Sequence, residues 1–183
     1  MKIMNFIFVL IVMMLTSAFL FGTMKYTPES EFEVRLIEGG KAIEIVGFNG
    51  TSQTVTIPSE IRGKSVMRIG QEAFAHKGLT TINIPNSVAI ILTYAFAGNQ
   101  LTQVNIPNGV QIIESGAFMN NQLTQVIIPR SVGSIGILAF AENQLTRVTI
   151  PSHTSIAGVY NPNNGVYVQT SFDIDVRIIR QRD

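Results

Sequence analysis

Several residue types and patterns that support chemistry are missing from this chain of 183 residues. It has no cysteine, which excludes disulfides, thiolate metal ligands and a cysteine nucleophile. Its two histidines, His76 and His153, do not form a His-x-x-x-His metal pattern. Glycine-rich phosphate loops, the Gly-x-Ser-x-Gly elbow and paired carboxylates are missing as well. These absences predict a protein that is not an enzyme and that takes no metal and no cofactor.

The chain also lacks an excess of charge of either sign. Its 13 basic and 12 acidic residues give a formal net charge of +1. Nucleic-acid binding requires clustered lysine and arginine, so no nucleic-acid partner is expected. Hydrophobic residues make up 46% of the chain, which favours a packed core over disorder.

The N-terminal segment, 1–25, differs in character from the rest of the chain. An apolar run follows Lys2, and its core at 6–15 has the length of the hydrophobic part of a signal peptide. Ala18 ends a small-residue stretch suited to cleavage, but the uncharged stretch from 3 to 22 is also long enough to cross a bilayer. We expect a cleaved signal peptide or an N-terminal membrane anchor at 1–25, with a buried core helix as the third alternative. The first two place residues 26–183 outside the cytoplasm, and only an uncleaved segment would contact a membrane.

What the sequence does contain is repetition. The stretch AFAGNQLTQVNIP at 95–107 returns with few changes at 117–129 and 139–151. Three residue types recur at intervals of 22, namely Pro85, Pro107, Pro129 and Pro151; Phe74, Phe96, Phe118 and Phe140; and Leu79, Leu101, Leu123 and Leu145. A fixed period of this length is typical of a solenoid, in which each unit buries its apolar face against its neighbours. A short insertion, within 61–65, interrupts the first coil.

Each repeat is predicted to contain two short extended segments and a corner. In L-T-x-V-x-I-P the apolar residues alternate with polar ones, as in a strand, and proline ends the segment. The second segment is V-x-x-I, and A-F-x-x-N is expected to form a brief helical corner whose asparagine bonds turn backbone groups. Stacked coils would place the phenylalanines in one internal column, where each stabilises the fold by a few kcal/mol. The fold class is therefore a β-rich repeat solenoid.

The two ends of the array depart from the repeat. Residues 26–57 are predicted to form an N-terminal β cap, built on a hairpin that turns at Gly39 and Gly40. About four coils occupy 58–151, and 152–183 are predicted to be a C-terminal β cap and tail. Its alternating residues indicate a strand over the open edge of the last coil; they are Phe172, Ile174, Val176 and Ile178.

The repeat unit resembles the BspA-type leucine-rich repeat. The stretch IPNSVAIILTYAFAGNQLTQVNIP at 84–107 is close to a full unit of that family, and the resemblance covers about residues 32–160. It implies a curved leucine-rich-repeat solenoid on a bacterial cell surface. It also implies a role of the kind that members of the family are associated with, namely adhesion to host matrix proteins such as fibronectin and fibrinogen, coaggregation or immune recognition. The family has no common catalytic residues, and this chain has fewer coils than its long surface antigens.

The candidate ligand-binding face is the row of L-T-x-V-x-I segments. Its outward positions form two columns, Thr81, Gln103, Gln125 and Arg147, and Asn83, Asn105, Ile127 and Thr149. These columns differ between coils while the inward positions stay fixed, which suits either ligand contact or a plain solvated surface. The leading hypothesis is an exported surface protein that binds a matrix or cell-surface protein through this face, in adhesion. The alternative is a structural spacer or assembly partner on the cell surface with no host ligand.

Overall fold

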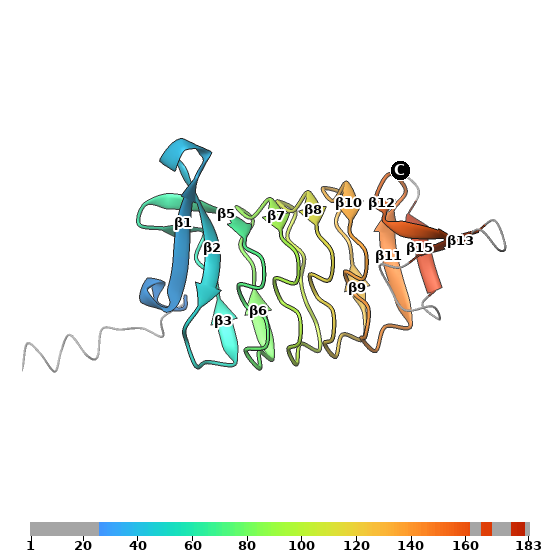
Figure 1. The fold of residues 1–183 in the computed structure, drawn as a ribbon, viewed down its shortest axis with the longest axis horizontal. Coiled ribbons are helices and arrows are strands. Elements are labelled where there is room, and N and C mark those ends of the chain that lie inside the picture. The colour runs from blue at the N-terminus through green and yellow to red at the C-terminus, as the bar shows by residue number, and fades with distance from the viewer. Residues whose placement is uncertain (1–25, 162–165, 170–176, 182–183) are drawn as a thin grey trace, which may run out of the picture.

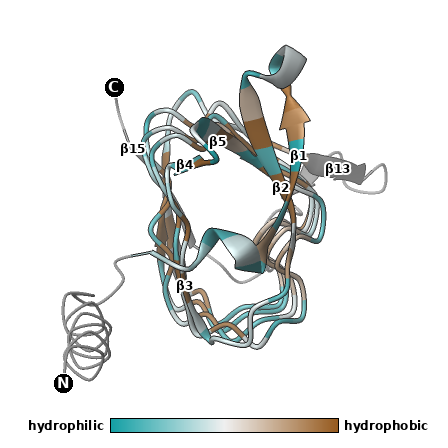
Figure 2. Cartoon of the chain, turned by 90° about the vertical axis from the view of Figure 1, so that its left-hand side faces the viewer, coloured by the Kyte–Doolittle hydropathy of each residue, from teal (hydrophilic) through white to brown (hydrophobic). Residues whose placement is uncertain are grey.

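The chain winds into a β-solenoid of stacked coils, with a hairpin at one end and short strands at the other (Figure 1). The computed structural model describes residues 26–161, 166–169 and 177–181. Seen along the solenoid axis, the coils lie one behind another with nearly the same outline (Figure 2). The predicted fold class, a repeat solenoid in which each sequence repeat forms one coil, is confirmed.

The helical content of the described ranges is confined to two short 3-10 helices, η1 (Glu29–Glu31) and η2 (Glu38–Gly40). The predicted corners are turns closed by hydrogen bonds from an N–H to the carbonyl three residues earlier, such as Ala97 N–H to Tyr94 O at 3.1 Å. The expected signal peptide or anchor at 1–25 lies outside the described residues. Within them, no helix has the length and apolar character needed to cross a membrane.

The phenylalanine column runs through the centre of the solenoid. Phe74 and Phe96 stack with their ring centroids 5.2 Å apart, and Phe118 follows at 5.2 Å. Phe140 continues the stack 5.3 Å beyond Phe118. Their side chains are fully buried, and the interplanar angles of 18°, 13° and 9° fall along the stack. The predicted register of one coil on the next is therefore confirmed.

One side of every coil contributes to a continuous sheet of eight strands. Its order is β1-β2-β5-β7-β8-β10-β12, with β4 paired to β5. The bounds are β1 Phe32–Ile37, β2 Ala42–Phe48, β4 Glu60–Ile61, β5 Lys64–Ile69, β7 Ile90–Ile91, β8 Ile112–Ile113, β10 Ser134–Ile135 and β12 Ser155–Ile156. From β5 onward the main path is parallel, because each coil returns to the same place after one turn. The short V-x-x-I segments thus form the longer of the two ladders.

The first coil begins with the predicted hairpin. Strands β1 and β2 pair antiparallel, and the chain turns through Gly39 and Gly40, which have φ of 65° and 87°. Phe48 at the end of β2 is buried and stacks on Phe74 with a centroid distance of 5.5 Å. The hairpin therefore closes the apolar column at this end. The predicted insertion forms a second small hairpin, in which β4 pairs with the start of β5.

The other side of the coils has an interrupted ladder. Strands β3 (Thr54–Thr56) and β6 (Thr81–Asn83) pair with each other, and β9 (Val126–Ile127) pairs with β11 (Arg147–Pro151). The equivalent segment at 103–105 forms no strand and pairs with neither β6 nor β9. The expectation of a strand in every coil is wrong at this position. Parallel pairing needs neighbouring backbones about 4.8 Å apart and correctly turned, and the coils do not meet that condition here.

The corner asparagines form a ladder of side-chain hydrogen bonds inside the solenoid, in addition to the phenylalanine column. Asn99 Oδ1 accepts hydrogen bonds from the N–H groups of Lys77 and Leu79, and its Nδ2 donates to Phe74 O and Phe96 O. Asn121 and Asn143 repeat the bonds to the leucine N–H and to the two phenylalanine carbonyls one and two coils later. The predicted bonding of turn backbone groups by the corner asparagine is present, and each side chain in addition joins two successive coils.

The last described coil is covered by β15 (Arg177–Gln181), which pairs parallel with β11. Strands β13 (Gly158–Asn161) and β14 (Val166–Gln169) form a separate antiparallel pair. A strand over the edge of the last coil is therefore present, and it includes Ile178. The other residues of the predicted alternation, Phe172, Ile174 and Val176, lie outside the described ranges.

Candidate ligand-binding groove

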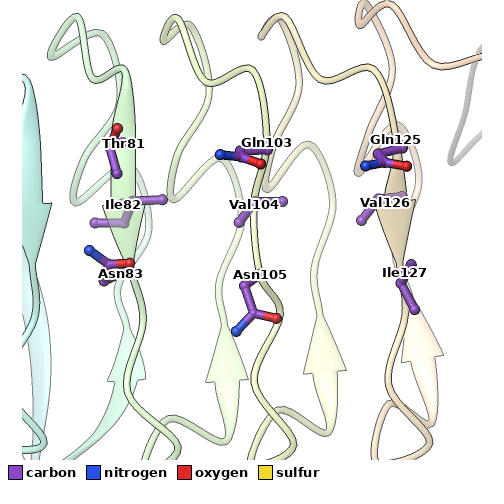
Figure 3. Close-up of a pocket in the computed structure, with 9 residues that line it drawn as sticks. All are labelled: Thr81, Ile82, Asn83, Gln103, Val104, Asn105, Gln125, Val126 and Ile127. Carbon is purple, nitrogen blue, oxygen red and sulfur yellow. The ribbon is translucent and has the colours of Figure 1, made fainter.

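An open groove lies over the interruption in the ladder (Figure 3). Its volume is about 330 Å³, and it crosses the middle coil and the coil on each side. Its lining consists of Thr81, Ile82, Asn83, Gln103, Val104, Asn105, Gln125, Val126 and Ile127. The side chains belong to β6, to the unpaired segment at 103–105 and to β9 with the residue before it. The groove therefore exists where the strands of adjacent coils fail to pair.

Six of the eight residues predicted for the ligand face line this groove. Thr81, Gln103 and Gln125 come from the first predicted column, and Asn83, Asn105 and Ile127 come from the second. All six are exposed. Arg147 and Thr149 belong to the next strand, β11, where Thr149 is in register with Ile127. The structure thus gives the first three members of each predicted column a shared concave surface.

The apolar floor was not among the predicted site residues. Ile82 and Val126 are buried, with exposures of 4% and 3%, as expected of inward strand positions. Val104, the equivalent residue in the middle coil, is only half-buried. Ile127 is 66% exposed and adds an apolar surface at the rim. The exposure of Val104 follows from the missing strand pairing, which the alternation of residues does not reveal.

The backbone of the middle coil is unpaired where it lines the groove. Within the part of the chain that the structure describes, the N–H and C=O groups of residues 103–105 make no hydrogen bond. The carboxamides of Gln103 and Asn105 are likewise without a protein partner among these residues. Backbone amides are strong donors and acceptors, so they require water or a ligand where no ladder exists. The groove therefore presents both side-chain and main-chain hydrogen-bonding groups.

The electrostatic character of the groove is neutral, because no charged residue lines it. His76 is exposed at a corner, and His153 lies with its Nε2 2.9 Å from Arg130 O, so neither belongs to the groove. No group of three His, Cys, Asp or Glu residues that could hold a metal ion occurs in the described ranges. The arrangement offers hydrogen bonding and apolar contact but no acid, base or nucleophile.

A second hollow of about 330 Å³ lies on the continuous sheet, over β8, β10 and β12. Its one charged residue, Glu114, already accepts hydrogen bonds from Thr93 N–H at 3.2 Å and Thr93 Oγ1 at 2.8 Å. The strands beneath it pair with each other without interruption. This hollow therefore offers fewer free hydrogen-bonding groups than the groove at 103–105.

Comparison with known families and structures agrees with the repeat geometry. The family model described as "BspA type Leucine rich repeat region" matches residues 41–164 in six copies. None of the curated proteins compared with the chain matches it.

Solved structures of bacterial leucine-rich repeat proteins have the same fold. A leucine-rich repeat protein of T. pallidum is 27% identical with a TM-score of 0.59, over 69% of this chain and 72% of that one. A protein of Bacteroides ovatus is 26% identical with a TM-score of 0.53, over 68% of this chain and 35% of that one. The pneumococcal vaccine antigen PcpA is 18% identical with a TM-score of 0.60, over 80% of this chain and 38% of that one, and this likeness concerns the fold alone.

The chain thus spans 35% and 38% of the lengths of the latter two proteins. The family match covers more than half of the chain and includes every coil that carries the phenylalanine column and the asparagine ladder. The chain belongs to the family of bacterial proteins with BspA-type leucine-rich repeats.

Proposed function

We propose that the chain is an exported protein of the bacterial cell surface that binds another protein through the groove at 103–105, in adhesion to host matrix or to other cells. The observation that carries this proposal is the concentration of unpaired main-chain and carboxamide groups in one exposed groove. A solvated surface with no ligand would not need an interrupted ladder, since full pairing would satisfy the same backbone groups.

A macromolecular ligand fits this groove better than a small molecule. The groove is open along its length, whereas small-molecule sites bury most of their ligand in a concave pocket. Strand β11 continues the ladder beyond the groove, and its half-buried Thr149, in register with Ile127, adds to the surface that a protein could contact. Leucine-rich repeat solenoids present extended surfaces of this kind to protein partners.

The alternative function, a spacer or assembly partner, is favoured by one observation at the other end of the molecule. Strand β1 pairs with β2 and, within the described residues, has no strand on its other side. Leu36 on this strand is 58% exposed. A free edge with an exposed leucine can pair with a second chain. Assembly through β1 would leave the groove unoccupied, so the two functions are separable by experiment.

The binding function predicts a loss of affinity when the groove carboxamides are removed. The full-length chain would be tested for saturable binding to immobilised fibronectin, fibrinogen and laminin. The triple variant Gln103→Ala, Asn105→Ala and Gln125→Ala is expected to bind at least about tenfold more weakly, because hydrogen bonds of about 1 kcal/mol each are lost.

The matched control removes three other exposed carboxamides, with Gln100→Ala, Gln122→Ala and Gln144→Ala. These glutamines occupy one equivalent position in successive coils and do not line the groove. The control should bind as tightly as the unchanged chain. Failure of the unchanged chain to bind any of the three proteins, or equal loss in both triple variants, would count against the proposed function.

A further inference from the structure

We infer that the occupant of the groove is an extended, uncharged stretch of polypeptide, held in part by the open backbone of residues 103–105. This inference rests on the proposed protein-binding function and specifies its ligand. It follows from three properties of the groove, namely its unpaired main chain, its lack of charge and its apolar floor.

The unpaired main chain lies in the middle coil, between two strands, β6 and β9, that pair with other strands. Strand β6 pairs with β3, and β9 pairs with β11, so each strand forms its hydrogen bonds on the side away from 103–105. The three peptide units between them have no partner within the described ranges. A polypeptide carries the same donors and acceptors along its length, and main-chain pairing is a common mode of peptide recognition.

The lining selects against charged ligands. Gln103, Asn105 and Gln125 each present an amide donor and a carbonyl acceptor, which are the two functions of a peptide group. The amide of Asn83 already donates to Thr56 Oγ1 at 3.0 Å. No lysine, arginine, aspartate or glutamate is present in the lining to compensate a charge on the ligand. A charged group would lose hydration without gaining an opposite charge, and this loss is unfavourable. The segment that binds should therefore be neutral where it contacts the groove.

The floor and the length of the groove favour a peptide over a glycan. Val104 and Ile127 give aliphatic contact surface, and no aromatic residue lines the groove to stack on a sugar ring. A peptide that pairs with residues 103–105 runs alongside them, and three extended residues span about 10 Å at about 3.3 Å per residue. The occupant is thus a short extended segment, or a loop of a larger protein that contains one.

The first test uses a phage-displayed library of linear heptapeptides as the probe and the immobilised full-length chain as the bait. The selected peptides are expected to lack charged residues in their common motif. Their affinity should change by less than about twofold between low and high salt, because no ion pairs form for salt to screen. Motifs rich in charge, or no enrichment at all, would overturn the inference. If fibronectin, fibrinogen or laminin still binds in that case, the proposed function stands and only this specification fails.

The second test separates the backbone contribution from that of the side chain. Asn105→Ala removes the carboxamide, and Asn105→Pro removes the carboxamide together with the N–H of residue 105. Because this N–H has no partner within the described part of the protein, both variants should retain the solenoid. The selected peptide is expected to bind Asn105→Pro about five- to tenfold more weakly than Asn105→Ala, as for one lost hydrogen bond. Equal affinities of the two folded variants would overturn the inference.

A measurement on the unchanged chain covers the case in which the proline variant fails to fold. The selected peptide should slow hydrogen exchange of the amides of residues 103–105 by at least about tenfold, as new hydrogen bonds protect them. Amides of the continuous sheet, such as that of Ile113, should be unaffected. Binding without any slowing at 103–105 would place the peptide elsewhere and overturn the inference.

Discussion

Replacement of Phe118 with alanine is expected to lower the free energy of unfolding by about 3–5 kcal/mol, the cost typical of removing a buried phenylalanine. The ring is fully buried and lies between Phe96 and Phe140, at centroid distances of 5.2 and 5.3 Å. Its removal would open a cavity that neither neighbouring ring can fill without leaving its own coil. Because whole domains are stable by only about 5–15 kcal/mol, the variant should be close to unfolding.

Urea unfolding followed by circular dichroism would measure this loss. The control is Ile127→Ala, at the most exposed large apolar residue among those described, with 66% exposure. This substitution should change the free energy of unfolding by no more than about 0.5 kcal/mol. A cost below about 1 kcal/mol for Phe118→Ala would mean that the stacked rings do not hold the coils together.

Replacement of Asn121 with alanine is expected to be similarly damaging, at about 3–5 kcal/mol, because several buried backbone groups lose their partner together. Asn121 Oδ1 accepts from Leu101 N–H at 3.1 Å, and Nδ2 donates to Phe96 O at 3.0 Å and to Phe118 O at 3.1 Å. All of these groups lie in the interior between two coils. Thermal or urea unfolding of the variant would measure the effect.

Two further variants identify the cause of that loss. Asn121→Asp keeps an acceptor of similar shape but removes the donors to Phe96 O and Phe118 O, so it should remain strongly destabilising. Gln122→Ala changes the adjacent exposed carboxamide and should cost no more than about 0.5 kcal/mol. If Asn121→Ala proved as mild as Gln122→Ala, the asparagine ladder would have no structural role.

The internal columns could be predicted from the sequence because each depends on a single repeated residue. Phe96 and Asn99 have counterparts at the same position of the following repeats, and a regular solenoid has only one way to superimpose such positions. Phe48 could not be assigned in this way, since it lies outside the period. It joins the column only because the hairpin β1–β2 folds against the first coil.

The interrupted ladder could not be predicted, because the local sequence gives no signal of it. Val104-Asn105-Ile106 has the same alternation as Ile82-Asn83-Ile84 in the preceding coil, yet only the latter contributes to a strand. Pairing depends on the distance and rotation between coils, which all coils determine together. Six residues of the predicted columns line the groove, and their role in binding stays a prediction, whereas the groove itself and its half-buried Val104 were not predicted.

The corners contain non-glycine residues with positive φ, which the sequence does not predict. Glu72, Tyr94 and Leu138 occupy equivalent positions with φ of 55°, 54° and 58°, a region that favours glycine. Of the four equivalent positions, only 116 is a glycine, with φ of 62°. Hydrogen bonds between coils, such as Tyr94 N–H to Ser115 O at 3.0 Å, hold the backbone there. Tertiary contacts thus override the local preference of the residue.

Residue-resolved hydrogen exchange of the free full-length chain tests most directly whether the backbone at 103–105 is unpaired. Within one coil, the amides of Gln103, Val104 and Asn105 should exchange rapidly. Those of Phe96 and Gln111 should exchange slowly, because they donate to Ala117 O and Ala89 O, both at 2.8 Å. Equal protection of both sets would show that the ladder is complete, and the groove would then offer no main-chain groups to a ligand.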